Sequence, residues 1–185
     1  LLKSPLFELS AYHKWCEMIE VLDGDVIKES AGLAPMDLAR ICQDESISHV
    51  IHCAAAVTFT QDLPAAAGSN ITSALNMQSL AARLKRNAKF VHVSTSFVHG
   101  DLTGSIGSAL PEKLFSFGPF DPVEIYKSML DTQFYASKAM SELRFHNSYS
   151  FSKSVCEHLL ALQNSADTTI IRPSIVGPAM ESPFE

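Results

Sequence analysis

The sequence lacks the features that mark a nucleic-acid-binding or disulfide-rich protein. Its 185 residues carry 14 Lys and Arg against 20 Asp and Glu, which gives a formal net charge of −6 at pH 7. Phosphate binding requires a basic surface, so this charge balance argues against a nucleic-acid partner. The four cysteines follow no zinc-binding or redox spacing, and we therefore expect reduced thiols in a cytosolic protein.

Long apolar runs and targeting signals are also missing. The longest apolar run, residues 50–59, contains His52 and is too short to span a bilayer. The sequence shows no signal peptide at its start and no polybasic cluster of the kind that binds anionic lipids. We therefore expect a cytoplasmic protein, or one on the cytosolic face of an organelle membrane. Peripheral membrane association of a longer chain stays open.

Two common catalytic patterns are absent from the sequence. The seven histidines form no metal-binding spacing, which predicts that the chain holds no metal. No Gly-x-Ser-x-Gly turn is present, so a hydrolase with a serine at such a turn is disfavoured. The chemistry of the chain must therefore be sought in other side chains.

What the sequence does contain is the composition of a folded domain. Hydrophobic residues make up 46% of the chain and charged residues 18%. Segments typical of strands and helices alternate, which predicts an α/β fold with a parallel sheet. The predicted strands are residues 17–22, 49–53, 89–93 and 168–171, and the predicted helices are residues 35–42, 63–86, 121–146 and 149–163. Residues 100–120 are rich in Gly, Ser and Pro and predict a surface loop.

A tyrosine and a lysine stand four residues apart in Tyr149-Ser-Phe-Ser-Lys153. Residues at this spacing share one face of a helix, so the phenol and the ammonium can enter the same cleft. A free tyrosine has a pKa near ~10, and a neighbouring lysine cation lowers that pKa toward the range useful for proton transfer. The same spacing also occurs by chance on surface helices, so the motif needs support from its surroundings.

Three hydroxyl side chains supply that support. Ser94, Thr95 and Ser96 directly follow the predicted strand 89–93. The carboxyl ends of strands in an open parallel sheet line the ligand crevice. A hydroxyl at this place can donate a hydrogen bond to a substrate oxygen that gains negative charge. The alternative interpretation is that the three residues only cap the segment that follows.

The order of these motifs resembles that of the extended short-chain dehydrogenases/reductases. Hydroxyl residues after a strand come first, then Tyr-x-x-x-Lys, then a strand that leads into Arg172-Pro173-Ser174-Ile175-Val176. Within that superfamily the sequence resembles the fatty acyl-CoA reductases, the male-sterility branch. The segments that carry this resemblance are residues 4–7, 50–59, 92–96, 149–160, 171–176 and 181–184.

The resemblance implies a Rossmann-like, doubly wound parallel sheet that is only partly present. The family's first strand–helix unit, with the Gly-rich turn that holds the cofactor pyrophosphate, should precede Leu1. Residues 1–185 would then form a partial NAD(P)-binding reductase domain. Gly100, Gly104 and Gly107 have a similar spacing but lie elsewhere in the order of motifs, and we interpret them as part of a loop.

The resemblance also implies the roles of individual residues. Tyr149 would donate a proton, and Lys153 would hold the nicotinamide ribose and lower the pKa of Tyr149. The catalytic hydroxyl falls on Thr95, five residues before Gly100, with the adjacent Ser94 as the alternative. The residues implied to bind the cofactor are Asp25, Val26, Cys53, Ala54, Ala55, Asn70, Tyr149, Lys153, Pro173 and Val176.

The activity implied by the family is the reduction of a fatty acyl-CoA thioester to a fatty alcohol through an aldehyde. NADPH is implied as the cofactor by the resemblance alone. A first alternative is another extended reductase that acts on a carrier-bound thioester, a hydroxysteroid or a sugar nucleotide. A second alternative is a non-catalytic nucleotide-sensing module, although both Tyr149 and Lys153 are retained here.

Overall fold

The computed structural model describes residues 17–100, 109 and 111–176. The elements are, in chain order, η2 (Glu29–Gly32), α2 (Pro35–Gln43), β1 (His49–His52), α3 (Leu63–Ala66), η3 (Ala67–Thr72), α4 (Ser73–Arg83), β2 (Lys89–Val93), η4 (Ser96–His99), α5 (Pro122–Leu130), α6 (Phe134–Glu142), α7 (Ser148–Gln163) and β3 (Thr168–Ile171). Three parts of the sequence discussed above lie outside the described residues: 4–7, 101–108 and 181–184.

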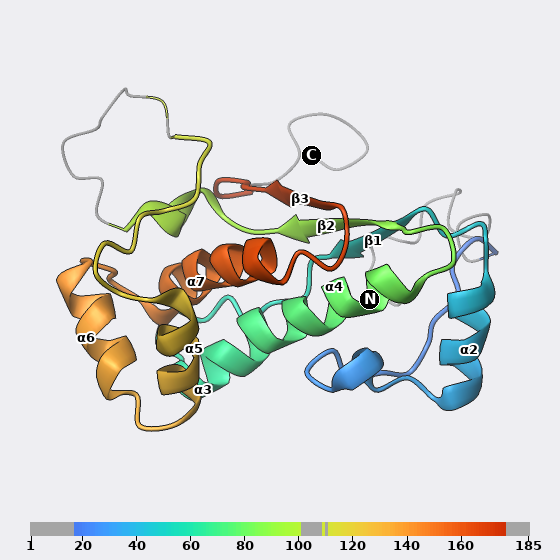
Figure 1. The fold of residues 1–185 in the computed structure, drawn as a ribbon, viewed down its shortest axis with the longest axis horizontal. Helices are drawn as coiled ribbons and strands as arrows, with labels where there is room; N and C mark the ends of the chain where they lie inside the picture. Colours follow the sequence, from blue (N-terminus) through green and yellow to red (C-terminus); the bar gives the residue numbers. More distant parts are fainter. Residues whose placement is uncertain (1–16, 101–108, 110, 177–185) are drawn as a thin grey trace.

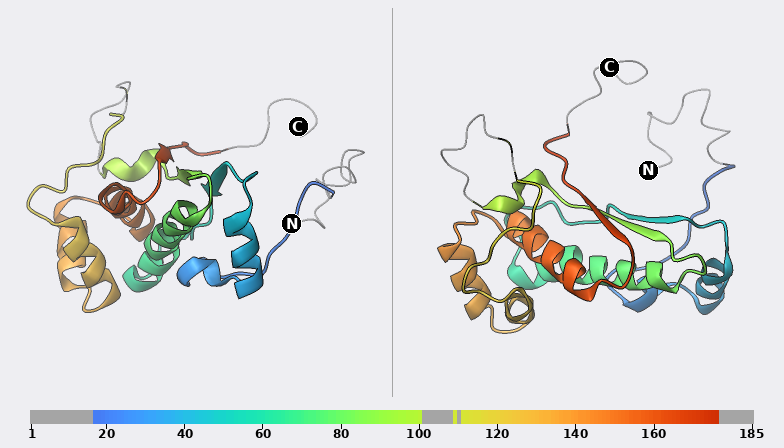
Figure 2. Two further views of the ribbon diagram at one scale, coloured as in Figure 1. Left: turned by 45° about the vertical axis from the view of Figure 1, so that its right-hand side comes forward. Right: turned by 45° about the horizontal axis from the view of Figure 1, so that its top comes forward.

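Three parallel strands form the sheet, in the order β1–β2–β3. The register places His52 beside His92 and Val93 beside Ile171, so the carboxyl ends of the strands lie at one edge. The helices α4 and α7 lie on the same side of the sheet in Figure 1 and in both views of Figure 2. This arrangement confirms the predicted α/β fold with a parallel sheet.

The hydrophobic core lies between the sheet and these helices. Phe90 on β2 is fully buried in one apolar cluster with residues of η3, α4 and α7. Ile71, Phe151 and Leu160 are fully buried members of the same cluster. Burial of each such side chain contributes roughly 1.5–3 kcal/mol relative to exposure, so the core holds α7 firmly against β2.

The helix predicted over residues 63–86 is present but has an interruption. It begins after Asp62, whose carboxylate accepts a hydrogen bond from the backbone of Ala65, and it ends at Arg83. Between α3 and α4 the segment η3 is π-helical, and it contains the buried Asn70. Such π-helical turns are frequent at functional sites.

The predicted strand over residues 17–22 is wrong. These residues form no strand, and their apolar side chains point outward: Met18 is 70% exposed and Val21 is 74% exposed. A strand needs a neighbour for its backbone hydrogen bonds, and in the described part of the chain no strand lies beside this segment. The segment instead leads into a loop closed by a 2.7 Å hydrogen bond from the Asp25 amide to the Ala31 carbonyl.

The single helix predicted over residues 121–146, lying over the sheet, is also wrong. The chain forms α5 and α6, which pack against each other, and α5 packs against α7. Gln133 has a left-handed backbone with φ of 63°, which a right-handed helix cannot continue through. Folding back buries the apolar side of each helix, since Ile125, Met129, Ala136 and Ala139 are all fully buried.

The remaining predictions agree with the structure. Strands β2 and β3 have the predicted bounds, β1 ends one residue early, and α7 begins one residue early. Asn147 caps α7 by accepting a 2.8 Å hydrogen bond from the Ser150 amide. The described part of the predicted loop from Gly100 to Phe120 follows directly after η4 and contains no helix or strand. In the described ranges no helix is both long and apolar enough to cross a membrane.

Candidate active site

Lys153 is buried inside the protein and is held at the carboxyl end of the central strand. Its side chain lies on α7 and is 1% exposed. The Lys153 Nζ donates a 2.8 Å hydrogen bond to the carbonyl of Val93, the last residue of β2. Burial lowers the pKa of Lys153 because desolvation disfavours the charged ammonium. An amine fixed in this way can serve as a positioned charge.

Tyr149 lies one turn before Lys153, near the start of α7, and is half-buried. Its ring packs against the ring of Phe59, with 5.9 Å between the ring centroids. The neighbouring Ser148 hydroxyl donates a 3.4 Å hydrogen bond to the Phe59 carbonyl. The start of α7 is therefore joined to the segment that follows β1.

Ser94 and Thr95 lie directly after β2 and are both buried. The Ser94 amide bonds to the Ile171 carbonyl at 2.7 Å, and the Thr95 backbone is extended, so the two side chains point to opposite sides. The Thr95 Oγ1 accepts a 3.3 Å hydrogen bond from the Phe97 amide, which leaves its own proton free to donate. The Ser94 Oγ has no hydrogen-bond partner within the described residues. Thr95 therefore caps η4, and within the described residues neither hydroxyl donates its proton to an acceptor.

Asn70 ties the loop after β1 to α7. Its Oδ1 accepts a 2.8 Å hydrogen bond from the Ala56 amide, and its Nδ2 donates to the Ala56 carbonyl at 3.2 Å. The same Nδ2 donates a 2.9 Å hydrogen bond to the Ser152 Oγ, which in turn donates to the Tyr149 carbonyl at 3.0 Å. The loop thus presents Cys53 and Ala54 as exposed residues at the carboxyl end of β1. Ala55, the next residue, is half-buried.

Two buried histidines, which the sequence patterns did not single out for this site, lie beneath Lys153. His52 and His92 occupy paired positions on β1 and β2, and their rings stack with 5.7 Å between centroids. Burial, with a smaller contribution from the Lys153 charge, lowers the pKa of His52 to about 4 and that of His92 to about 2. Burial raises the pKa of the adjacent Cys156 thiol to about 12. These groups are therefore neutral, and no local sequence signal identifies them, because the pairing of the two histidines depends on strand register.

The structure places the remaining predicted residues in two different surroundings. Pro173 lies beside the hydroxyl residues, since its carbonyl accepts a 2.9 Å hydrogen bond from the Ser96 amide, whereas Val176 is 83% exposed. Asp25 and Val26 belong to the loop before α2, the blue segment in Figure 1. Asn76 of α4 fixes that loop by donating to the Val26 carbonyl at 3.2 Å. This hydrogen bond fixes the loop to α4, whereas Tyr149 and Lys153 belong to α7.

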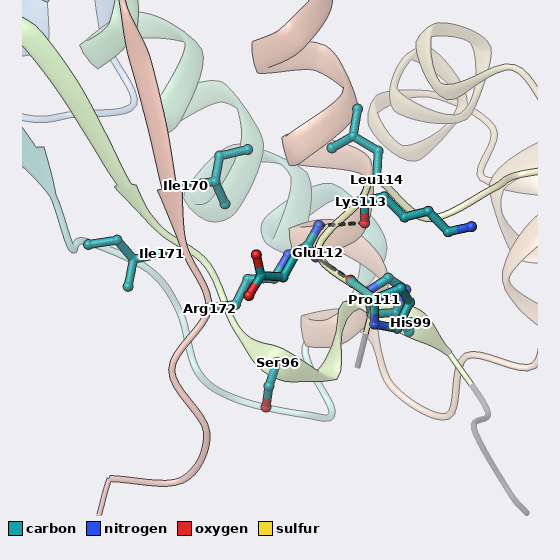
Figure 3. Close-up of a pocket in the computed structure, with 9 residues that line it drawn as sticks. All are labelled: Ser96, His99, Pro111, Glu112, Lys113, Leu114, Ile170, Ile171 and Arg172. Carbon is teal, nitrogen blue, oxygen red and sulfur yellow. Dashed lines mark hydrogen bonds between the residues drawn. The ribbon is translucent and has the colours of Figure 1, made fainter. Parts of the chain in front are cut away.

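An open cavity of about 740 Å³ adjoins the hydroxyl residues on the β3 side. Figure 3 shows its lining, which includes Ser96, Ile171, Arg172 and residues 111–114. Both apolar and charged side chains contribute to the lining. Ser96 lines the cavity, whereas the buried Ser94 and Thr95 precede it in the chain and are not part of the lining.

These residues fit a nicotinamide cofactor. An ammonium has three N–H donors, and the Val93 carbonyl takes one donor of Lys153, which leaves two for ribose hydroxyls. The partnerless, buried hydroxyl of Ser94 offers a further polar contact. All of these groups lie at the carboxyl ends of the strands, where open α/β sheets bind dinucleotides.

Comparisons with known proteins show which family the chain resembles. Residues 1–184 match an NAD-binding family described as male sterility protein. A Drosophila melanogaster protein named as a fatty acyl-CoA reductase is 29% identical over 100% of this chain, which covers 34% of that protein. Fatty acyl-CoA reductase 1 of Gallus gallus is 29% identical over 76% of this chain and 27% of its own length. The chain thus spans about a third of the length of the curated relatives it matches.

A solved structure supports the fold assignment. The terminal R domain from the myxalamid PKS-NRPS biosynthetic pathway aligns with a TM-score of 0.59 at 20% identity, over 88% of this chain and 35% of that chain. At this identity the likeness shows the fold alone, and it confirms the predicted Rossmann-like α/β class. Because the family match extends over almost all 185 residues, the chain belongs to the male sterility protein family of NAD-binding domains.

Proposed function

We propose that this chain carries the reducing site of an NADPH-dependent fatty acyl-CoA reductase, which converts an acyl-CoA thioester to a fatty alcohol through an aldehyde. The supporting observation is the buried Lys153, which lies one turn after Tyr149 and bonds to the last carbonyl of β2. That carbonyl directly precedes Ser94 and Thr95. The names of the curated relatives add the substrate class, and the choice of NADPH rests on the family resemblance alone.

The proposed chemistry assigns one task to each side chain. When bound, NADPH would supply a hydride to the carbonyl carbon in each of two reductions. The first would leave the aldehyde after the C–S bond breaks and CoA departs as the thiol, and the second, from a second NADPH, would convert the aldehyde to the alcohol. Thr95 donates a hydrogen bond to the carbonyl oxygen as this atom gains negative charge, with Ser94 as the alternative donor. Tyr149 donates its phenolic proton to the same oxygen. Lys153 stabilises the phenolate that remains, because an adjacent cation favours the charged form of the phenol.

Binding of the cofactor would use the segments at the carboxyl ends of the strands. We assign the nicotinamide ribose to Lys153 and Tyr149. The loop of Cys53, Ala54 and Ala55, held in place by Asn70, would lie beneath the cofactor. The residues assigned to the two far edges of the dinucleotide are Asp25 and Val26 at the adenine and Pro173 and Val176 at the nicotinamide side.

The decisive assay uses the full-length protein that contains this chain. Purified protein is incubated with a fatty acyl-CoA and NADPH, and the products are identified by mass spectrometry. We expect oxidation of NADPH together with formation of fatty alcohol and free CoA. Turnover only with carrier-bound thioesters, hydroxysteroids or sugar nucleotides would identify another extended reductase. Cofactor binding without turnover of any of these substrates would identify a nucleotide-sensing module.

A further inference from the structure

A buried carboxylate lies on the same side of α7 as the two proposed catalytic residues. Glu157 follows Lys153 by four residues, as Lys153 follows Tyr149, and this spacing places all three near one face of the helix. The Glu157 side chain is 1% exposed. The Arg172 Nε donates to Glu157 Oε1 at 2.9 Å and the Arg172 Nη2 donates to Glu157 Oε2 at 2.5 Å. Arg172 is the first residue after β3, so the pair joins the catalytic helix to the end of that strand.

The same guanidinium also binds the segment beyond η4. Arg172 Nη1 donates to the Pro111 carbonyl at 3.2 Å, and Arg172 Nη2 donates to the Lys113 carbonyl at 3.0 Å. Figure 3 shows the Arg172 side chain directed at these two residues. His99 Nε2 lies 3.3 Å from Arg172 Nη1 and 3.1 Å from the Pro111 carbonyl. Since His99 ends η4, which Thr95 caps, the network extends to the segment of the candidate hydroxyls.

The chemistry of this network depends on the shape of arginine. A guanidinium holds five N–H donors in a planar fork, which can satisfy a carboxylate and two carbonyls at once. The hydrogen bonds to Glu157 raise the pKa of Arg172, so its charge is retained. A buried ion pair contributes little net stability compared with an apolar pair of similar volume, and its attested use is to fix the register of neighbouring elements.

We propose that Glu157 and Arg172 are positioning residues, which hold Tyr149 and Lys153 on α7 in register with the segment that begins at Thr95. This inference rests on the proposed function for its kinetic consequences. Neither side chain bonds to the proposed catalytic groups, so both act through the segments they join. Loss of the pair should lower kcat because the proton donor and the hydroxyl donor no longer converge on one substrate oxygen. The KM values should change little, since binding is not the step that the pair controls.

The main test replaces the ion pair in the full-length protein by an apolar pair, Glu157→Leu with Arg172→Met. This change removes the network and avoids leaving a single buried charge. We expect a thermal midpoint close to that of the wild type, a kcat lower by roughly 10- to 100-fold, and KM values within about twofold. The matched control is Lys138→Met with Glu142→Leu, an exposed ion pair on α6, which should change neither constant. A double variant with wild-type kcat overturns the proposal, and so does one altered only in KM.

A single substitution keeps the test decisive if the double variant does not fold. Arg172→Lys retains a cation beside Glu157 but lacks the fork of donors needed for the two carbonyls. We expect its kcat to fall by roughly tenfold, whereas wild-type kcat in this variant would show that charge alone is sufficient and would overturn the proposal.

A second measurement does not depend on the substrate. In hydrogen exchange without ligand, the double variant should expose the amides of residues 96–99 roughly tenfold faster, while residues 151–160 of α7 keep their protection. Unchanged exchange at residues 96–99 would contradict the positioning role even in a protein that reduces acyl-CoA. Faster exchange at residues 96–99, in a protein whose wild type shows no reductase activity, would support the positioning role and count against the proposed function alone.

Discussion

The two ends of the helix layer differ in how firmly they hold their polar groups. At the end that carries α7, Lys153 and Asn70 are buried and bonded to neighbouring segments. At the end before α2, the Asp25 side chain is 46% exposed, and Asn76 holds its loop through backbone carbonyls only. Catalytic side chains must be held in fixed positions to act on a substrate, whereas an exposed loop is sufficient to bind the far end of a cofactor. We infer that the first end determines turnover and the second determines cofactor affinity.

The largest effect is expected at Lys153. Replacing it with methionine keeps the length of the side chain and removes the cation that stabilises the phenolate. We expect kcat to fall by roughly 10²–10⁴-fold in the full-length protein, measured by steady-state oxidation of NADPH. Lys127→Met is the matched control, because Lys127 is exposed and pairs only with Glu124 in the described residues, and it should not change kcat. A Lys153→Met variant as active as this control would contradict the inference that the α7 end determines turnover.

The second effect separates Thr95 from Ser94. Thr95→Val keeps the β-branched shape and deletes the hydroxyl, so kcat should fall by roughly 10²–10³-fold. Ser94→Ala should cost much less, and Thr95→Ser should retain most of the activity. If Ser94→Ala is the impaired variant, the catalytic hydroxyl is Ser94, consistent with its buried and partnerless Oγ. Such a result would leave Tyr149 and Lys153 in their roles.

The third effect concerns stability and pH. The pKa of His52 is about 4 and that of His92 about 2 in the folded protein, both below the ordinary value of 6.5. The unfolded chain therefore takes up protons first, and stability that is present above pH 6.5 is lost as the pH falls toward the folded values. Between pH 6.5 and 5 each histidine should cost roughly 2 kcal/mol.

Thermal midpoints measured at pH 7 and pH 5 test this expectation. His92→Phe should reduce the loss between the two pH values, because one titrating group is removed from beneath Lys153. His49→Asn is the control, since His49 is exposed on β1 and should leave the loss unchanged. An equal loss in the wild type and in His92→Phe would show that the buried histidine is not its source.

The smallest effect is expected at the loop before α2. Asp25→Asn keeps an oxygen that can accept the 3.1 Å hydrogen bond from the Ile27 amide, so the loop should keep its shape. The KM for NADPH should rise by about three- to tenfold with kcat unchanged, as expected for a lost binding contact. Asp23→Asn, on an exposed residue of the same loop, is the matched control. A change in kcat for Asp25→Asn, or an equal rise in KM for both variants, would contradict the inference that this loop determines cofactor affinity alone.

Local sequence was sufficient for the parts of the fold that local chemistry determines. The β-branched run of β3 and the capped helix α7 carry their signals in adjacent residues, such as the Asn147 cap. The reversal between α5 and α6 carries no glycine or proline, because Gln133 takes the left-handed conformation, and so a continuous helix was predicted. The strand predicted over residues 17–22 failed for a different reason. The segment has the local pattern of a strand, but in the described part of the chain no strand lies beside it to pair with.

The candidate site also contains some residues that local sequence predicts and others that only the fold brings together. Tyr149 and Lys153 could be predicted because they stand four residues apart on one helix, and this spacing places both on one face. The bond from Lys153 to Val93 joins residues 60 positions apart, and the pairing of His52 with His92 depends on strand register. Neither contact has a local signal. The same holds for Glu157 on α7 and Arg172 after β3, which are 15 positions apart.

The most direct test of the central claim compares cofactor binding with turnover in Tyr149→Phe. In the full-length protein, the Kd for NADPH is measured by fluorescence titration and kcat by formation of fatty alcohol from acyl-CoA. Only the phenolic hydroxyl is removed, so we predict a Kd within about twofold of the wild type and a kcat reduced by roughly 10²–10⁴-fold. A variant that binds NADPH normally and retains more than about a tenth of wild-type turnover would contradict the assignment of Tyr149 as the proton donor.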